Sequence, residues 1–188
     1  MAKQRKAETG SEMPVPVLRH VLVVGGTLPA WDALGDERWA ARRSDLAKVA
    51  AHAGAMWLTI RPYDRGDASG ECSTQRLIDV REGCTVIVDP SPDGRERFLR
   101  AVAQLQETAV ADVDEAALSS VLMAPAPMEP DLVVILGPSH SLPPSLVWEL
   151  AYSEIVFIDT PWGDLTGSHV ETAIDEYSRR HRRFGGIE

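Results

Sequence analysis

Apolar and polar positions follow two recurring patterns along this chain. Short apolar runs rich in β-branched residues predict buried strands, and longer stretches with apolar residues every three or four positions predict amphipathic helices. The runs that predict strands are 19–24, 57–60, 84–88, 131–136 and 155–158. The stretches that predict helices are 36–53, 74–80, 93–108, a segment from Asp112 or Asp114 to Met123, 143–152, and a last helix capped by Ser168.

The order of these elements predicts the fold class. Short apolar strands take turns with amphipathic helices, a pattern typical of a parallel sheet. We therefore expect an α/β fold, a single domain whose central, mostly parallel sheet carries helices on both faces. A length of 188 residues also fits one domain.

The two ends of the chain differ from its middle. Residues 1–16 are polar, include three basic side chains and contain no apolar segment of the kind found in secretory signals. We expect a disordered tail at 1–16 and one folded domain at 17–188. No apolar run approaches the length of a membrane span, so a cytoplasmic location with at most peripheral membrane contact is expected.

Charge and cysteine content exclude some functions. The formal net charge is −9, from 19 basic and 28 acidic residues, which argues against a nucleic-acid partner because such binding needs clustered positive charge. Cys72 and Cys84 have no zinc or disulfide spacing. Both are expected to be thiols in a reducing compartment, with Cys84 buried at the start of a strand. His140 and His169 have no ligand cluster around them, so no metal or cofactor is expected in this chain.

Three segments resemble the cis-prenyltransferase family, whose members make undecaprenyl and dehydrodolichyl diphosphates. They are Leu18-Arg19-His20-Val21, the pair formed by 130–133 and the Trp-x-Leu-Ala-Tyr-x-Glu run at 146–154, and the ending at 182–186. The resemblance covers nearly the whole chain after the tail and implies the same α/β fold.

The residues that the family uses for catalysis are replaced here. Gly26 stands where the family's magnesium-binding aspartate should be, and Ala30 stands where an arginine should be. Ile135 and Ser141 occupy the positions of two arginines that bind the second diphosphate. A departing diphosphate needs metal and basic groups to stabilise its charge, so we expect no catalytic residue in this chain. The connection at 61–83 is also shorter than the family's tunnel-forming segment.

The same pattern is found in the non-catalytic partner branch of the family, which includes the Nogo-B receptor. This chain resembles that branch at 60–64, 112–118 and 136–138, and in its C-terminal Arg-x-Gly. The resemblance implies an accessory subunit in a heterodimer or heterotetramer with a catalytic homologue. That partner would hold Mg²⁺ and make polyprenyl diphosphate from farnesyl-type and isopentenyl diphosphates.

Two groups of site residues follow from the resemblance. Arg183, Gly185 and Gly186 are expected to bind diphosphate in trans, in the partner's active site. Trp148, Tyr152 and Glu154 are expected at the dimer interface. From local sequence alone, basic residues followed by glycine are also typical of an ordinary helix end.

Two other functions remain open at this stage. The chain could be a stand-alone prenyltransferase with altered short-chain chemistry, which would need anion-binding or metal-binding groups, and Arg61, Arg65 and Glu154 are the candidates. It could also be a homodimeric scaffold with no enzymatic role.

Overall fold

A computed structural model describes residues 17–66, 75–108, 113–137 and 141–180. The expected disordered tail at 1–16 lies outside these residues, as do Cys72, His140 and the C-terminal Arg-x-Gly. Cys84 is fully buried at the start of a strand, as expected.

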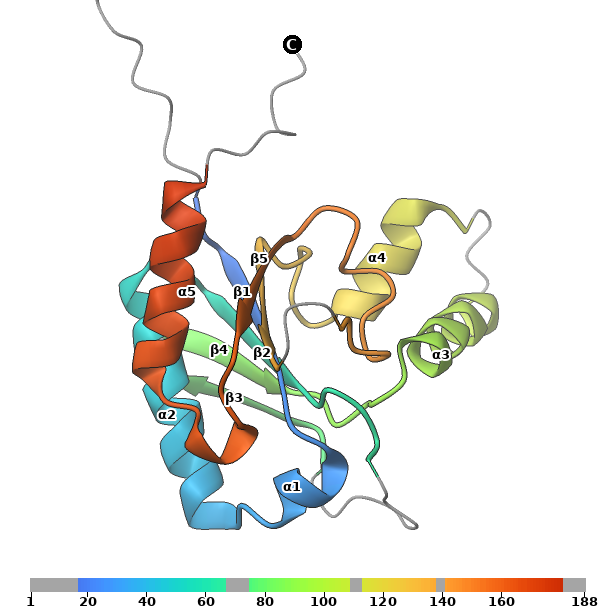
Figure 1. Ribbon diagram of the computed structural model, residues 1–188. Helices are drawn as coiled ribbons and strands as arrows, with labels where there is room; N and C mark the ends of the chain where they lie inside the picture. The colour runs from blue at the N-terminus through green and yellow to red at the C-terminus, as the bar shows by residue number, and fades with distance from the viewer. Residues whose placement is uncertain (1–16, 67–74, 109–112, 138–140, 181–188) are drawn as a thin grey trace, which may run out of the picture.

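A six-stranded sheet forms the centre of the molecule, in the order β3-β4-β2-β1-β5-β6 (Figure 1). The strands are β1 (His20–Val24), β2 (Trp57–Arg61), β3 (Leu77–Arg81), β4 (Cys84–Val88), β5 (Leu132–Leu136) and β6 (Glu154–Ile158). All neighbouring strands pair in parallel except β3 and β4, which are antiparallel. The predicted α/β class and mostly parallel sheet are therefore confirmed.

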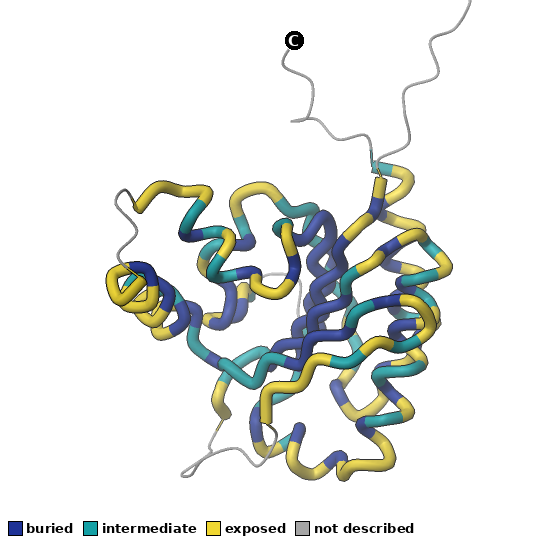
Figure 2. Tube along the Cα trace, turned by 180° about the vertical axis from the view of Figure 1, so that it is seen from behind, coloured by how far each residue is buried: buried dark blue, intermediate teal, exposed yellow. Residues whose placement is uncertain are grey.

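Helices cover both faces of the sheet. On one face lie α2 (Asp36–His52) and α5 (Gly167–Arg179), and on the other lie α3 (Gly94–Glu107) and α4 (Glu115–Met123) (Figure 1). Because both faces are covered, every residue of β1 and β5 is buried (Figure 2). This double burial explains why these strands are continuous apolar runs rather than alternating ones.

The two faces of the sheet differ in character. The face under α2 and α5 carries the larger core, to which β1 contributes Val21 and Val23. The face under α3 and α4 receives the alternate residues of β1, namely His20, Leu22 and Val24, because successive side chains of a strand point to opposite sides. This second face holds a smaller apolar cluster and most of the buried charge.

The helix predicted at 74–80 is not formed by the described residues 75–80. Leu77–Arg81 is instead the edge strand β3, which forms a hairpin with β4. The turn is Glu82-Gly83, and both residues have positive φ, 52° and 82°. Such two-residue turns match the twist of a hairpin, so the local turn chemistry favoured a strand over a helix.

Residues 143–152 were also wrongly predicted as a helix, and they form consecutive turns. The backbone carbonyl of Pro144 accepts a hydrogen bond from the Gly94 amide at 2.9 Å, and that of Ser145 accepts one from the Arg97 guanidinium at 3.3 Å. These carbonyls are therefore bonded to α3 rather than to amides further along their own segment.

Two smaller differences concern helix starts. The short helix α1 (Leu28–Asp32) was not predicted, although Thr27 caps it and Pro29 lies in its first turn. The last helix is capped by Thr166, whose side chain bonds with His169, rather than by Ser168. Among the described helices, none combines the length and the apolar composition needed to cross a bilayer.

His20, the ionisable residue of β1, is deeply buried, with 1% of its surface exposed. Its Nε2 lies 2.9 Å from Thr59 Oγ1, and its Nδ1 lies 3.0 Å from the carbonyl of Met128. Burial lowers the pKa of this imidazole from 6.5 to about 4. The folded protein therefore holds His20 neutral at pH values where an unfolded chain would protonate it.

We predict a loss of stability in mild acid that depends on His20. Because the folded-state pKa is the lower one, the unfolded state binds more protons between about pH 6.5 and 4, and stability falls as pH falls through that window. Between pH 7 and pH 5 the free energy of unfolding should drop by about 2 kcal/mol. Urea titrations of the wild type and of His20→Gln check this, since the variant should lose most of the slope. An unchanged slope in His20→Gln would assign the acid sensitivity elsewhere.

Candidate functional site

The carboxyl ends of the parallel strands meet at one edge of the sheet, where open α/β folds commonly bind ligands. There β1 is followed by Gly25-Gly26. The Gly25 amide donates to the carbonyl of Arg61 at 3.0 Å, and the Tyr63 amide donates to the carbonyl of Gly26 at 2.7 Å. The loop after β1 is thus fastened to the end of β2.

Gly26 has no room for a side chain. Its φ is +72°, and a Cβ built on it would lie 2.6 Å from Cγ of Trp162. A positive φ is strained for most residues with a side chain, and a carbon contact below 3.0 Å requires the ring to move. The position at which the family resemblance implies a metal-binding aspartate is therefore closed by an indole.

Three tryptophans form the cluster that closes this position. Trp31 stacks on Trp162 with ring centroids 5.5 Å apart, and Trp39 meets Trp31 edge-on at 4.8 Å. The indole of Trp31 donates to the carbonyl of Gly25 at 2.8 Å, and that of Trp39 donates to the carbonyl of Trp31 at 3.1 Å. Aromatic packing and backbone hydrogen bonds together hold the glycine loop in place.

Arg42 fixes Trp162 from the side of α2. Its guanidinium carbon lies 4.6 Å from the Trp162 ring centroid, within cation–π range. Its two terminal nitrogens donate to the carbonyls of Trp162 and Gly163 at 2.5 and 3.0 Å. Trp162 is consequently held by its ring and by its backbone.

The other replaced positions are also occupied by packing or internal bonds. Ile135 is fully buried in an apolar cluster with Leu22, Val24 and Leu146. The hydroxyl of Tyr63 donates to Ser141, at 2.7 Å from the side-chain oxygen. Neither position offers a cation to a diphosphate.

A cluster of four buried charges lies next to this edge, which we call the charge quartet: Arg61, Asp89, Arg97 and Glu149. Glu149 accepts hydrogen bonds from Arg61 at 2.6 Å and from Arg97 at 3.0 Å. Asp89 lies 3.3 Å from Nε of Arg61 and 3.5 Å from Nε of Arg97. The quartet joins the ends of β2 and β4, helix α3 and the 141–153 segment.

The electrostatics of the quartet follow from burial and mutual attraction. Burial opposes the charge on Glu149, but the two guanidinium groups outweigh it and lower the pKa of this carboxyl from 4.5 to about 2. Burial likewise opposes the charge on Arg61, yet Glu149 and Asp89 hold its pKa above the usual value. Burial also opposes the charge on Asp89, but Arg61 and Arg97 outweigh it and lower the pKa of that carboxyl, whereas burial lowers the pKa of Arg97. The formal charges of the two acids and the two arginines cancel.

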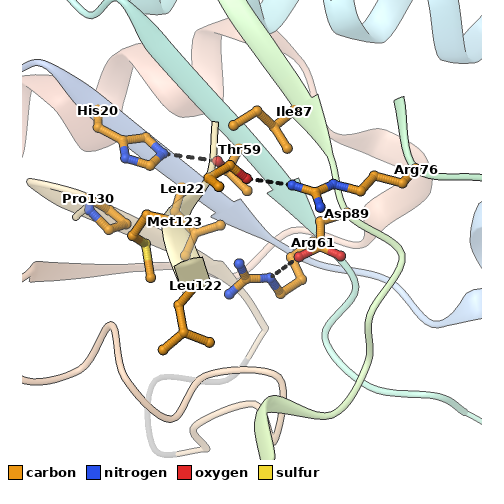
Figure 3. A pocket seen from close by; sticks show the side chains of 11 residues that line it. His20, Leu22, Thr59, Arg61, Arg76, Ile87, Asp89, Leu122, Met123 and Pro130 are labelled. Carbon is orange, nitrogen blue, oxygen red and sulfur yellow. Dashed lines mark hydrogen bonds and ion pairs between the residues drawn. The ribbon is translucent and has the colours of Figure 1, made fainter. Parts of the chain in front are cut away.

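A small cavity adjoins the quartet on the sheet face under α4 (Figure 3). Its walls include His20, Thr59, Arg61, Arg76 and Asp89, and its volume of about 10 Å³ leaves space for about one water molecule. The guanidinium of Arg76 reaches its rim and donates to the carbonyl of Ala124 at 2.5 Å (Figure 3). A polyprenyl tail does not fit a cavity of this size.

The structure places the three expected interface residues differently. Trp148 is half-buried, donates to Glu129 at 2.6 Å and lies against Phe98 at 6.2 Å between ring centroids. Tyr152 is 76% exposed. Glu154 begins the edge strand β6 and forms an ion pair with Arg180 at 3.6 Å. Arg183, Gly185 and Gly186 lie outside the described residues.

Glu154 and Gly26 lie near opposite ends of the sheet. Glu154 pairs with Leu132, which pairs with Val21, whereas Gly26 is the second residue after the end of β1. Five residues of strand separate the two levels, roughly 16 Å. Within the described ranges, no group of three or more His, Cys, Asp or Glu side chains is placed to hold a metal ion.

The charge quartet was not predicted, apart from Arg61 as one candidate anion-binding residue. A weak signal for half of it was present, because Arg61 and Asp89 each come at the carboxyl end of a buried strand, and such ends meet at one edge. Arg97 and Glu149 had no such signal. Glu149 is 88 residues from Arg61 and 52 from Arg97, and nothing local to these residues indicates their pairing.

Comparison with known sequences finds relatives along much of the chain. Residues 74–185 match the family model described as putative undecaprenyl diphosphate synthase. An isoprenyl transferase of Aquifex aeolicus is 36% identical over 94 residues, which are 50% of this chain and 41% of that protein. Isoprenyl transferase 2 of Bradyrhizobium diazoefficiens is 33% identical over 155 residues, which are 77% of this chain and 61% of that protein. The chain thus spans about half the length of the curated relatives it matches.

Solved structures share the fold. A probable undecaprenyl diphosphate synthase from Campylobacter jejuni superposes with a TM-score of 0.62 at 18% identity, covering 90% of this chain and 99% of that one. Lavandulyl diphosphate synthase from Lavandula x intermedia, solved with dimethylallyl diphosphate, gives 0.65 at 18% identity, again over 90% of this chain and 99% of that one. Fold, motifs and matched residues together place this chain in the cis-prenyltransferase family, the family of undecaprenyl diphosphate synthase.

Proposed function

We propose that this chain is the non-catalytic subunit of a heteromeric cis-prenyltransferase. A catalytic homologue would hold Mg²⁺ and both diphosphates, and would make polyprenyl diphosphate from farnesyl-type and isopentenyl diphosphates. This chain would contribute Arg183, Gly185 and Gly186 to the partner's active site, where a guanidinium and backbone amides can bind phosphate oxygens.

The observation that carries the proposal is the closed position at Gly26. A metal-binding side chain there would collide with Trp162, which Arg42 and Trp31 hold in place. Burial of Ile135 supports the same conclusion for the second diphosphate, because no cation stands at that position. A chain without these groups can support prenyl transfer only beside one that has them.

A stand-alone prenyltransferase is the less favoured function. Its three candidate residues do not converge on one site. Arg61 is committed to the charge quartet, Arg65 is exposed on a loop, and Glu154 lies near the opposite end of the sheet from Gly26. A homodimeric scaffold shares the same folded chain and differs only in lacking a catalytic partner and diphosphate binding.

Co-expression with candidate catalytic homologues from the same genome tests the proposal. The pair should co-purify and elongate farnesyl diphosphate with isopentenyl diphosphate in the presence of Mg²⁺, whereas this chain alone should not. Elongation by the isolated chain would establish the stand-alone enzyme. Failure of every homologue to co-purify, together with a stable homodimer, would favour the scaffold.

We predict that Gly26→Ala destabilises the protein more than Gly83→Ala. Both glycines have a positive φ, +72° and +82°, but an added Cβ meets nothing within 4 Å at Gly83. The control substitution should therefore lower the free energy of unfolding by about 1 kcal/mol, through backbone strain alone. Gly26→Ala should lower it by about 1–3 kcal/mol more, because the added Cβ overpacks the site. Urea denaturation measures both values. Equal losses would show that Trp162 does not close the position.

We predict that Tyr152→Ala weakens the complex without weakening the fold. Because its side chain is largely exposed, the free energy of unfolding should change by less than about 0.5 kcal/mol. If the interface lies here, a buried tyrosine anchor should cost the complex at least about tenfold in Kd. Leu99→Ala is the control, since Leu99 is 67% exposed on α3. Trp148→Ala is less informative, because it also breaks the bond to Glu129. Equal Kd values for the Tyr152 and Leu99 variants would show that the interface lies elsewhere.

We predict that Arg183→Ala lowers turnover of the complex by about ten- to a hundredfold and leaves assembly intact. Charge-assisted hydrogen bonds to a diphosphate are worth ~1.5–3 kcal/mol. Arg179→Ala is the matched control, because Arg179 is an exposed arginine in the last turn of α5. Melting temperature and prenyl transfer should be measured for both complexes. Small and equal effects of the two substitutions on turnover would show that the C-terminal motif is an ordinary helix end without a role in diphosphate binding.

A further inference from the structure

A second, larger cleft opens beside the charge quartet. It has a volume of about 350 Å³ and lies between the β4–α3 connection, α3 and α4. Its polar lining consists of Arg76, Asp89, Ser91, Arg97, Arg100 and Gln104. Arg76 lines the small cavity of Figure 3 as well, so the two hollows share a wall. Volumes of about 300 Å³ and above are typical of small-molecule sites.

Two of the cleft's arginines form no ion pair within the described residues. In the part of the chain that the structure describes, neither Arg76 nor Arg100 has a carboxylate oxygen within 4.0 Å, in contrast to Arg97. Among the described residues, Arg76 donates to the carbonyl of Ala124 at 2.5 Å, and its charge helps to lower the pKa of Asp89. Arg100 donates to the carbonyl of Glu96 and to the hydroxyl of Ser91, at 3.3 and 3.4 Å. Each guanidinium has five N–H donors, so most of them remain available.

The charge balance of the region is positive in an acidic protein. The cleft and the quartet together hold four arginines against two acids, Asp89 and Glu149, whereas the whole chain has a formal net charge of −9. The two acids are already paired with Arg61 and Arg97. The remaining positive charge is concentrated on Arg76 and Arg100, and low-dielectric walls strengthen its attraction for an anion.

We propose that this cleft binds a small phosphate-bearing molecule, with Arg76 and Arg100 as its contacts to the phosphate oxygens. Arginine matches phosphate geometry because it donates two parallel hydrogen bonds. Ser91 and Gln104 supply neutral polar groups beside them, and Val121 and Leu122 supply an apolar wall for an organic portion. The cleft belongs to this chain alone, so the proposal does not depend on the accessory role.

Titration calorimetry of the full chain in low-salt buffer tests the proposal, with inorganic diphosphate as the first probe. Arg76→Ala and Arg100→Ala should each weaken diphosphate binding about 10- to 100-fold, the effect of losing charge-assisted hydrogen bonds. Arg95→Ala is the matched control, because Arg95 is an exposed arginine of the same helix that does not line the cleft. Its affinity should equal that of the wild type. Melting temperatures verify that each variant is folded.

Further probes define the ligand class. Orthophosphate should bind more weakly than diphosphate, since it offers fewer oxygens to the two arginines. Isopentenyl diphosphate binding more tightly than inorganic diphosphate would indicate an organic ligand that uses the apolar wall, and equal binding would indicate the free anion. Absence of heat and of any melting-temperature increase at ~10 mM diphosphate would overturn the proposal. Equal weakening by Arg95→Ala and Arg100→Ala would also overturn it, by showing attraction to helix charge in general.

Discussion

The charge quartet is the constraint on which one half of this molecule depends. Glu149 is completely buried and has two guanidinium partners, and Asp89 approaches the same two groups. Removing one member of such a cluster leaves an uncompensated buried charge, which typically costs 3–5 kcal/mol. The ends of two strands, the start of α3 and the 141–153 segment must therefore be in place together.

This constraint explains the division of labour between the two faces of the sheet. Under α2 and α5 the core is mainly apolar, and side-chain packing holds its elements together. Under α3 and α4 the position of each element is set by directional bonds to Arg61 and Arg97, which tolerate little displacement. Between this face of the sheet and α4 lies a water-sized cavity, which Arg61 and Asp89 of the quartet help to line.

Most of the fold was predictable because local sequence patterns determine most of its strands and helices. Five of the six strands are apolar runs, and α2, α3, α4 and α5 follow the helical period, with bounds close to those predicted. The failures have identifiable causes. β3 is a short, largely exposed edge strand rather than a buried apolar run, so its signal was the Glu82-Gly83 turn. The 143–152 segment has helical periodicity, but Glu149 and the carbonyls of Pro144 and Ser145 bond to α3, and no local signal indicates that. The tryptophan cluster over Gly26 could not be predicted for the same reason, since Trp162 is distant in sequence from Trp31 and Trp39.

The contact between Gly26 and Trp162 has an evolutionary consequence. A single substitution that adds a side chain at position 26 would strain the backbone and displace the indole. Replacing Trp162 first would remove a ring that Trp31, Trp39 and Arg42 all contact. Substitutions at sites in contact are not additive, so the order in which they occur matters. A side chain at position 26 therefore requires coordinated changes at position 162 and around it, which makes the glycine and the tryptophan cluster mutually dependent in evolution.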